Sequence, residues 1–380
     1  MLNLIGFLIV VIITMFRMES GYASNPLLNS GTLILCGYLL SLFMTQCRLP
    51  AVFGYIIAGI LFAGNGLGFV DVQFTGQVFF FENICIMMIL AESVRIMTAN
   101  QKLGNFLRYF ITGVLSTIIT MVAITFMPWS ATIPIGLKAG VGLLASMFSP
   151  LAVYSLVKKD HSASMLQIAF GGFITSLLLW GAATGYLSPE KSEGFRRALM
   201  PFIIGLSSIT AGFVWALFAE KTIYDASPRL SSTYPLALMI LLYPLIQPLG
   251  LDFMFLATGI GLYNGIISTR EFAKTSQFYL PFLIVFVLFG TKLSIEEIFI
   301  ARSMWLSTLG VGVLILFVRA MAIMLTARLL LASPVRFDNI VSFLMYGPLS
   351  FIILQRFLPA FRSLPGGDDG FNVLYMFSIM

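Results

Sequence analysis

Long apolar runs, each about as long as a bilayer is thick, dominate this chain. A spanning helix needs about 20 mostly apolar residues, because the hydrocarbon core is about 30 Å thick and each helical residue rises about 1.5 Å. Backbone polar groups must be paired inside lipid, so such runs fold as helices. The sequence therefore predicts an all-α polytopic membrane protein with about 13 to 14 transmembrane helices.

The expected helices follow the apolar runs. Their approximate spans are 2–16, 31–47, 49–68, 79–99, 107–128, 135–157, 163–187, 199–219, 231–249, 251–268, 278–293, 303–331 and 338–360. A last run, 371–380, is too short to span, which fits either a half helix or a chain that continues. The first run has no basic residue before it, so we expect a retained helix in preference to a signal peptide.

Composition narrows the function classes. Charged residues make up 10% of the chain and hydrophobic residues 59%, against about 25% and about 45 to 50% in soluble domains. This excludes a soluble globular enzyme, and the few scattered basic residues predict no nucleic-acid partner. The three cysteines lie within apolar runs, and neither they nor the single histidine have the spacing of metal ligands. We therefore expect no metal centre, no cofactor and no enzymatic activity.

Basic residues in the connections predict the orientation. Loops rich in Lys and Arg tend to stay in the cytoplasm. One set of alternate loops carries Arg48, Lys102, Arg108, Lys158, Lys159, Lys221, Arg229, Arg270, Lys274 and Arg336, whereas the other carries fewer. The first set is therefore predicted to be cytoplasmic, which places the amino terminus inside if the first run spans.

Among the charged residues inside the predicted helices, four stand out: Glu92, Arg95, Lys138 and Arg319. Embedded charge costs several kcal/mol, so each such residue is a candidate site. Arg95 and Lys138 lie near helix ends, where we interpret them as reaching toward the interface. Glu92 lies deeper, and both a site and an interface position remain open for it. Arg319 lies near the middle of its helix, so we expect it to face protein or water.

Two of the runs contain strong helix breakers. Ser149-Pro150 interrupts one helix and Gly347-Pro348 interrupts another. Proline removes a backbone donor and frees a carbonyl four residues earlier. Paired interruptions at corresponding positions of two halves indicate a transporter's ion-binding site, where half-helix ends hold the ion. The alternative is that both are ordinary kinks, which membrane helices tolerate.

Several segments, in order, resemble the monovalent cation/proton antiporter superfamily. They are CRLPAVFGYIIAGILFAGNGLGFV, ILAESVRIM, SMFSPLAVYSLVKKD, PLGLDFMFLATGIGLYNG, LPFLIVFVLFGTKLS and VRAMAIMLTARLL. The first is similar to the leucine-proline signature of an early helix, the third to the unwound helix, and the last to the helix with an embedded basic residue, here Arg319. The resemblance covers most of residues 31–360.

The resemblance implies a fold and an activity. The fold would be a single membrane domain over 1–380 with two inverted repeats, 31–187 and 199–380, whose two broken helices cross at the ion site. A panel domain would dimerise, and a core domain would move in an elevator-like way. The activity implied is exchange of sodium or potassium for protons. The partners implied are the lipid bilayer, here a bacterial inner membrane, and a second copy of the chain.

The departure from the family lies in the helix after the first broken one. In the family, that helix carries an aspartate, usually paired with another aspartate or an asparagine, which binds the cation or the protons. Here Thr175 and Ser176 occupy the matching positions, and no carboxylate occurs between Asp160 and Glu190. Hydroxyl groups can ligate a cation but cannot titrate. Proton-coupled exchange therefore needs a carboxylate from elsewhere.

Glu92 is the predicted replacement, both as the titrating group and as the partner of Arg319. The lead hypothesis is a transporter of antiporter fold that moves a small ion, with Ser149, Pro150, Thr175, Ser176, Arg319, Glu92, Gly347 and Pro348 around the site. A site centred on an arginine would equally suit an anion. The second hypothesis is a degenerate relative that does not exchange ions and acts as a scaffold or regulatory subunit of a membrane complex.

Overall fold

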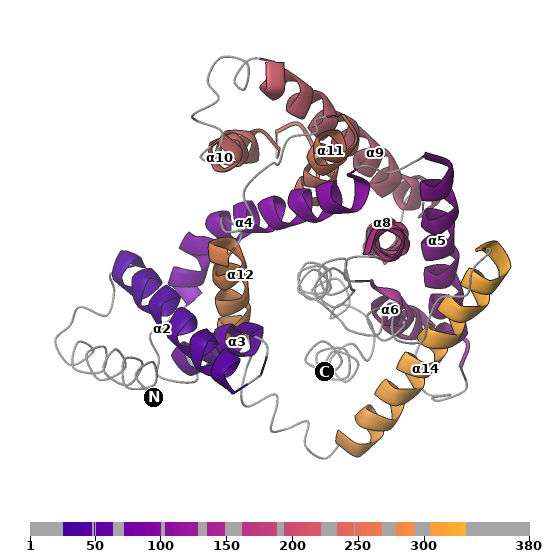
Figure 1. Ribbon diagram of the computed structural model, residues 1–380, viewed down its shortest axis with the longest axis horizontal. Coiled ribbons are helices and arrows are strands. Elements are labelled where there is room, and N and C mark those ends of the chain that lie inside the picture. Colours follow the sequence, from indigo (N-terminus) through magenta and orange to yellow (C-terminus); the bar gives the residue numbers. More distant parts are fainter. Residues whose placement is uncertain are drawn as a thin grey trace. The chain divides into compact units, whose positions relative to one another are not determined.

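The computed structural model describes twelve stretches of the chain. They are residues 26–47 with 49, 51–63, 72–99, 103–127, 135–148, 162–187, 194–221, 234–246, 248–267, 279–292 and 305–331. Every element assigned within these residues is a helix (Figure 1). The predicted all-α fold class is therefore confirmed.

The helix bounds follow the apolar runs of the sequence. In chain order the helices are α2 (Pro26–Gln46), α3 (Ala51–Phe62), α4 (Val72–Thr98), α5 (Leu103–Thr125), α6 (Ile135–Ser146), α8 (Ser162–Leu187), α9 (Gly194–Ala219), α10 (Tyr234–Ile246), α11 (Phe253–Ile266), α12 (Tyr279–Lys292) and α14 (Trp305–Leu330). The predicted runs 2–16, 338–360 and 371–380 lie outside the described residues.

Three helix ends differ clearly from the prediction. Helix α3 ends at Phe62, before the glycine-rich part of its predicted run. Helix α4 begins at Val72, seven residues before its predicted start, because a helix can extend past the apolar segment that sequence hydropathy detects. Helix α6 ends at Ser146, well before the expected end at residue 157. In a continuous helix, a proline at position 150 would clash with the carbonyl four residues earlier, that of Ser146, so the sequence itself disfavours a helix that runs on to residue 157.

The chain divides into two compact units. Unit 1 comprises Met1–Ile89, Arg229–Tyr243 and Ala273–Arg302, and unit 2 comprises Leu90–Pro228, Pro244–Phe272 and Ser303–Met380. Each unit thus combines segments from both predicted repeat regions, 31–187 and 199–380. The repeats themselves stay a prediction.

In unit 1, α3 packs against both α2 and α12 (Figure 1). Glycines permit this close approach. A Cβ atom on Gly59 would lie 2.7 Å from the Cα atom of Gly290, so the two glycines meet where α3 crosses α12. A Cβ atom on Gly54 would lie 2.5 Å from the backbone of Ser41 on α2. Small residues of this kind let membrane helices pack backbone against backbone.

In unit 2, α5 lies against α6, α8 and α14, and α9 lies against α8 and α11. Glycines again form the contacts. A Cβ atom on Gly113 of α5 would collide with the backbone of α8, and one on Gly171 of α8 would collide with the carbonyl oxygen of Phe110. Because α6 and α14 also pack against α5, this close pairing of α5 with α8 gathers the helices of the candidate site.

Four of the described helices are long and apolar enough to cross a membrane. The segments are Phe106–Thr125, Ser164–Ala182, Phe202–Ala219 and Val313–Leu330. Their outer faces carry large apolar side chains, among them Leu206, Phe218 and Leu329, which are more than half exposed. A soluble protein rarely exposes so much contiguous apolar surface, whereas lipid covers it without cost.

Candidate functional site

Arg319 lies at the centre of the candidate site in unit 2. It sits well inside α14, and its side chain is fully buried. Its Cζ atom lies 4.5 Å from the centroid of the Phe148 ring, and Nη1 donates a long hydrogen bond, 3.5 Å, to the carbonyl oxygen of Ala145. Both contacts come from the carboxyl end of α6.

The end of α6 is suited to a positive charge. The last carbonyls of a helix have no partner within it, and together they form the negative pole of the helix dipole. Since α6 ends at Ser146, the carbonyl of Ala145 belongs to this last turn. The face of an aromatic ring also attracts a cation, by about 0.5 to 2 kcal/mol. The helix end and the Phe148 ring therefore both stabilise the guanidinium.

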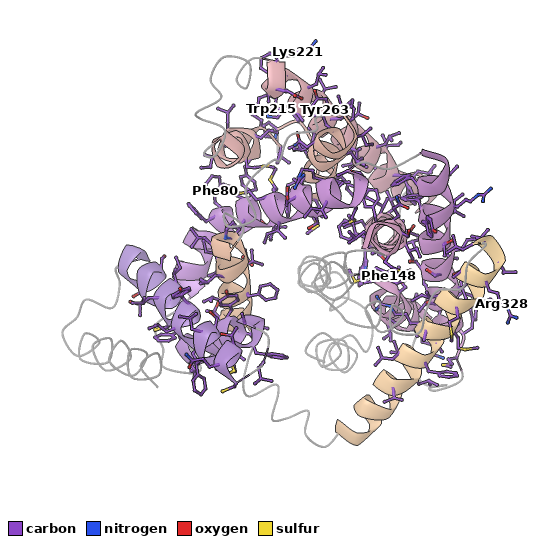
Figure 2. All side chains as sticks on the ribbon, in the orientation of Figure 1. Phe80, Phe148, Trp215, Lys221, Tyr263 and Arg328 are labelled. Atoms are coloured by element: carbon purple, nitrogen blue, oxygen red, sulfur yellow. The ribbon has the colours of Figure 1, made fainter. Side chains whose placement is uncertain are left out.

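Helix α8 has a glycine, Gly172, at this point, which leaves room for a neighbouring ring. A Cβ atom on Gly172 would overlap the ring of Phe148 and would lie 2.8 Å from Oγ1 of Thr117 on α5. Phe148, which is labelled in Figure 2, therefore lies against Gly172, and its ring face meets Arg319. The single ring connects α6, α8 and α14 at one point.

Hydroxyl groups line the neighbouring part of α5. Thr112, Ser116, Thr117 and Thr120 are fully buried. Three of them donate to carbonyls of their own helix, as Ser116 does to Gly113 at 2.9 Å. Oγ1 of Thr117 has no hydrogen-bond partner among the described residues. Because the other hydroxyls donate inward, their oxygen lone pairs remain available to accept.

The two hydroxyl residues that replace the family's carboxylates lie on α8. Thr175 donates to the carbonyl of Gly171 at 2.7 Å, and Ser176 donates to the carbonyl of Gly172 at 2.8 Å. Ser176 is buried and Thr175 is partly buried. Ser176 thus bonds to the backbone of the same glycine that receives Phe148. Ligation of a dehydrated cation by such oxygens is chemically possible, because each hydroxyl still has lone pairs.

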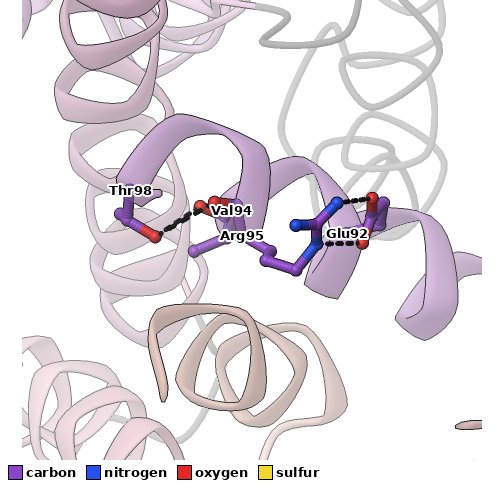
Figure 3. Close-up of polar contacts among 4 residues, drawn as sticks. All are labelled: Glu92, Val94, Arg95 and Thr98. Atoms are coloured by element: carbon purple, nitrogen blue, oxygen red, sulfur yellow. Dashed lines mark hydrogen bonds and ion pairs between the residues drawn. The ribbon is translucent and has the colours of Figure 1, made fainter. Parts of the chain in front are cut away.

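Glu92 forms an ion pair on its own helix. Nε of Arg95 donates to Oε2 of Glu92 at 2.7 Å, and Nη2 donates to Oε1 at 2.5 Å (Figure 3). This two-point contact holds both carboxylate oxygens. Arg95, which we interpreted as reaching toward the interface, is thus a partner of Glu92, and the meeting of Glu92 with Arg319 stays a prediction.

The structure describes part of the predicted site. Arg319, Thr175 and Ser176 lie in unit 2 on helices that pack around α5, while Ser149, Pro150, Gly347 and Pro348 lie outside the described residues. Sequence reasoning missed Phe148, Gly172 and the hydroxyl row of α5. The row had a visible signal, because Thr112, Ser116 and Thr120 recur every four residues and so share one helix face.

No protein-family model and no curated protein matches the sequence. Among solved structures, the sodium proton antiporter MjNhaP1 from Methanocaldococcus jannaschii at pH 8 matches with a TM-score of 0.66 and 15% identity, over 96% of this chain and 95% of that one. An electron-microscopy structure of the same antiporter matches with a TM-score of 0.69 over 96% and 93% of the two chains.

This chain has the sodium/proton antiporter fold. The match spans nearly the whole of both chains, so it is not confined to one motif. The resemblance inferred from the sequence segments is thereby confirmed for the fold. Together with the four membrane-length apolar helices, the antiporter fold makes this an integral, multi-pass membrane protein in contact with a lipid bilayer.

Proposed function

We propose that this protein is a membrane transporter of the sodium/proton-antiporter type, which moves a small monovalent ion by alternating access. The observation that carries the proposal is the antiporter fold over 96% of the chain. A fold alone does not assign chemistry, so the argument also rests on the site. A buried arginine beside a helix end and a row of buried hydroxyls is typical of an ion path.

The ion is proposed to be sodium or potassium, and the path to pass the end of α6. Hydroxyl oxygens of Thr175 and Ser176 would supply ligands, together with backbone carbonyls near Ser149-Pro150 and Gly347-Pro348. Arg319 would hold the end of α6 in place by its contacts with Ala145 and Phe148. The movement proposed is elevator-like, in a homodimer in a bacterial inner membrane.

Proton coupling requires a titrating carboxyl group. Helix α8 contains none, because its sequence has no Asp or Glu. Glu92 is poorly suited, since Arg95 donates hydrogen bonds to both of its carboxylate oxygens. Coupling through Glu92 would require this ion pair to open during the cycle.

The test is ion-dependent proton movement in liposomes. Purified protein is reconstituted with a pH-sensitive dye inside the vesicles, and sodium, potassium or lithium is added outside at several pH values. We expect a dye response to at least one cation, which empty liposomes do not give. Replacing Arg319 by Met should reduce it strongly. Silence for all three cations across the pH range would contradict the proposal.

A second candidate function is a scaffold or regulatory subunit that keeps the fold without exchange. The observation that favours it is the absence of any acid from the α8 sequence. Ser176→Asp separates the two functions, with Ser176→Asn as a matched control without charge. Exchange gained only in the Asp variant indicates intact machinery that lacks a ligand. A silent Asp variant, and a stoichiometric partner that copurifies, would favour the scaffold.

A further inference from the structure

Thr117 on α5 has a hydroxyl group that the backbone does not use. Its side chain is fully buried, and Oγ1 has no hydrogen-bond partner in the described part of the chain. The hydroxyls of Thr112, Ser116 and Thr120 on the same helix donate instead to carbonyls of the preceding turn. A buried hydroxyl without a partner costs stability, and a ligand at this position would offset that cost.

Gly172 on α8 is the residue that the Thr117 hydroxyl faces. A Cβ atom on Gly172 would lie 2.8 Å from Oγ1 of Thr117. One turn earlier on α5, a Cβ atom on Gly113 would lie 2.8 Å from the backbone nitrogen of Gly172, so this turn of α5 packs directly against that glycine. The close packing of the two helices therefore holds the Thr117 hydroxyl against the backbone of α8.

A second hydroxyl adjoins the same glycine from α8. Oγ of Ser176 donates to the carbonyl oxygen of Gly172 at 2.8 Å, and Ser176 is buried. The ring of Phe148 lies at Gly172 as well, since a Cβ atom on this glycine would overlap it. Gly172 thus brings together hydroxyl groups from two helices at the end of α6.

The hydrogen bonds of these hydroxyls decide which kind of ligand fits. The O–H groups of Ser176 and Ser116 are bonded to their own helices, so their oxygens still offer lone pairs. Lone pairs attract a cation and repel an anion. Uncharged oxygens suit a monovalent cation, whereas divalent cations are mostly bound through carboxylates, and the sequences of α5 and α8 contain no Asp or Glu.

We propose that Thr117 is a ligand of a monovalent cation where α5 packs against α8, together with Ser176. The Thr117 hydroxyl can rotate, so that its oxygen faces the ion and its proton points away. Arg319 meets the Phe148 ring from α14, and its charge opposes a cation nearby, so the affinity should be low. The inference rests on the proposed function for its role in transport, whereas cation binding is measured separately.

Thermal unfolding in detergent measures cation binding without transport. Purified protein is titrated with sodium or potassium chloride, and choline chloride keeps the ionic strength constant. A ligand that binds the folded state raises the unfolding temperature. Thr117→Val keeps the shape of the side chain but removes the hydroxyl. It should raise the half-saturating cation concentration about tenfold, the size expected when one contact to a charged partner is lost.

Thr112→Val is the matched control for this variant. Thr112 is equally buried on the same helix, but its hydroxyl donates to the carbonyl of Arg108. The control should lose stability in choline and keep the cation-induced shift. Thr117→Val loses no hydrogen bond and should keep its stability in choline. Thr117→Ser should restore the shift, and Thr117→Ala is a second variant without the hydroxyl in case the valine variant does not fold.

The outcomes separate the inference from the proposed transport. A full cation-induced shift in Thr117→Val, or no shift in the wild type with either cation, would overturn the inference. If the shift depends on Thr117 while wild-type liposomes show no dye response, the ligand stands and the proposed transport fails. If Thr117→Val liposomes respond at the same cation concentrations as the wild type, transport stands and the inference fails.

Discussion

At the scale of single residues, the site depends on how buried charge is stabilised. Arg319 lies against the last turn of α6 and over the ring of Phe148, and Glu92 lies against Arg95. The depth of Arg319 was predictable from its position in a long apolar run. Its contact with Phe148 was not, because the two residues lie far apart in sequence and meet only through the packing of α6, α8 and α14.

The contact between Arg319 and Phe148 can be measured by a double-mutant cycle. The variants are Phe148→Leu, Arg319→Met and their combination, and the measurement is thermal unfolding in detergent. We expect a coupling free energy of about 0.5 to 2 kcal/mol, the size of a buried cation–ring interaction. Phe173→Leu is the control, because Phe173 is equally buried but has no contact with a cation in the described structure. A coupling no larger than that of the control would contradict the assignment.

The ion pair of Glu92 predicts a second result. Glu92→Gln leaves the mostly buried Arg95 without its carboxylate, and should lower the free energy of unfolding by about 3 kcal/mol. Adding Arg95→Met to Glu92→Gln should recover much of this loss, since the unpaired buried charge is then removed. Unfolding by heat in detergent again measures both. If the double variant is less stable than Glu92→Gln alone, the unpaired charge of Arg95 does not cause the loss of stability.

At the scale of helices, the sequence predicts positions well and ends poorly. The apolar runs predict α8, α11, α12 and α14 to within a few residues. The end of α6 was expected at residue 157, although Pro150 contains the signal for an earlier end. The pairing of α5 with α8 could not be predicted, since it depends on which glycines face each other.

That pairing gives a test of close packing. A methyl group on Gly171 would collide with the carbonyl oxygen of Phe110, so Gly171→Ala should force α5 and α8 apart and cost about 1 to 3 kcal/mol. The control is Gly31→Ala on α2, where no atom lies within 4 Å of the added methyl group. It should be neutral or slightly stabilising, because alanine favours helix more than glycine. Equal thermal stability of the two variants would contradict the packing described.

At the scale of the whole molecule, the distribution of basic residues predicts which loops face the cytoplasm. Cys47 lies next to Arg48 in one of the loops predicted to be cytoplasmic, and it is exposed, whereas Cys36 and Cys85 are buried. The natural chain therefore contains its own reporter of orientation.

Labelling of Cys47 tests this orientation. A maleimide that cannot cross membranes should label inside-out vesicles and leave right-side-out vesicles unlabelled until they are permeabilised. Cys47→Ser should abolish the labelling in both. Labelling of intact right-side-out vesicles through Cys47 would reverse the predicted orientation, and with it the predicted cytoplasmic amino terminus.

The burial of Arg319 has an electrical consequence. A guanidinium keeps its proton at any physiological pH, so this positive charge cannot be removed during a cycle. A whole elementary charge that crosses the membrane potential changes energy by about 2.3 kcal/mol for every 100 mV. Any step in which α14 shifts along the membrane normal therefore has a rate that depends on the membrane voltage.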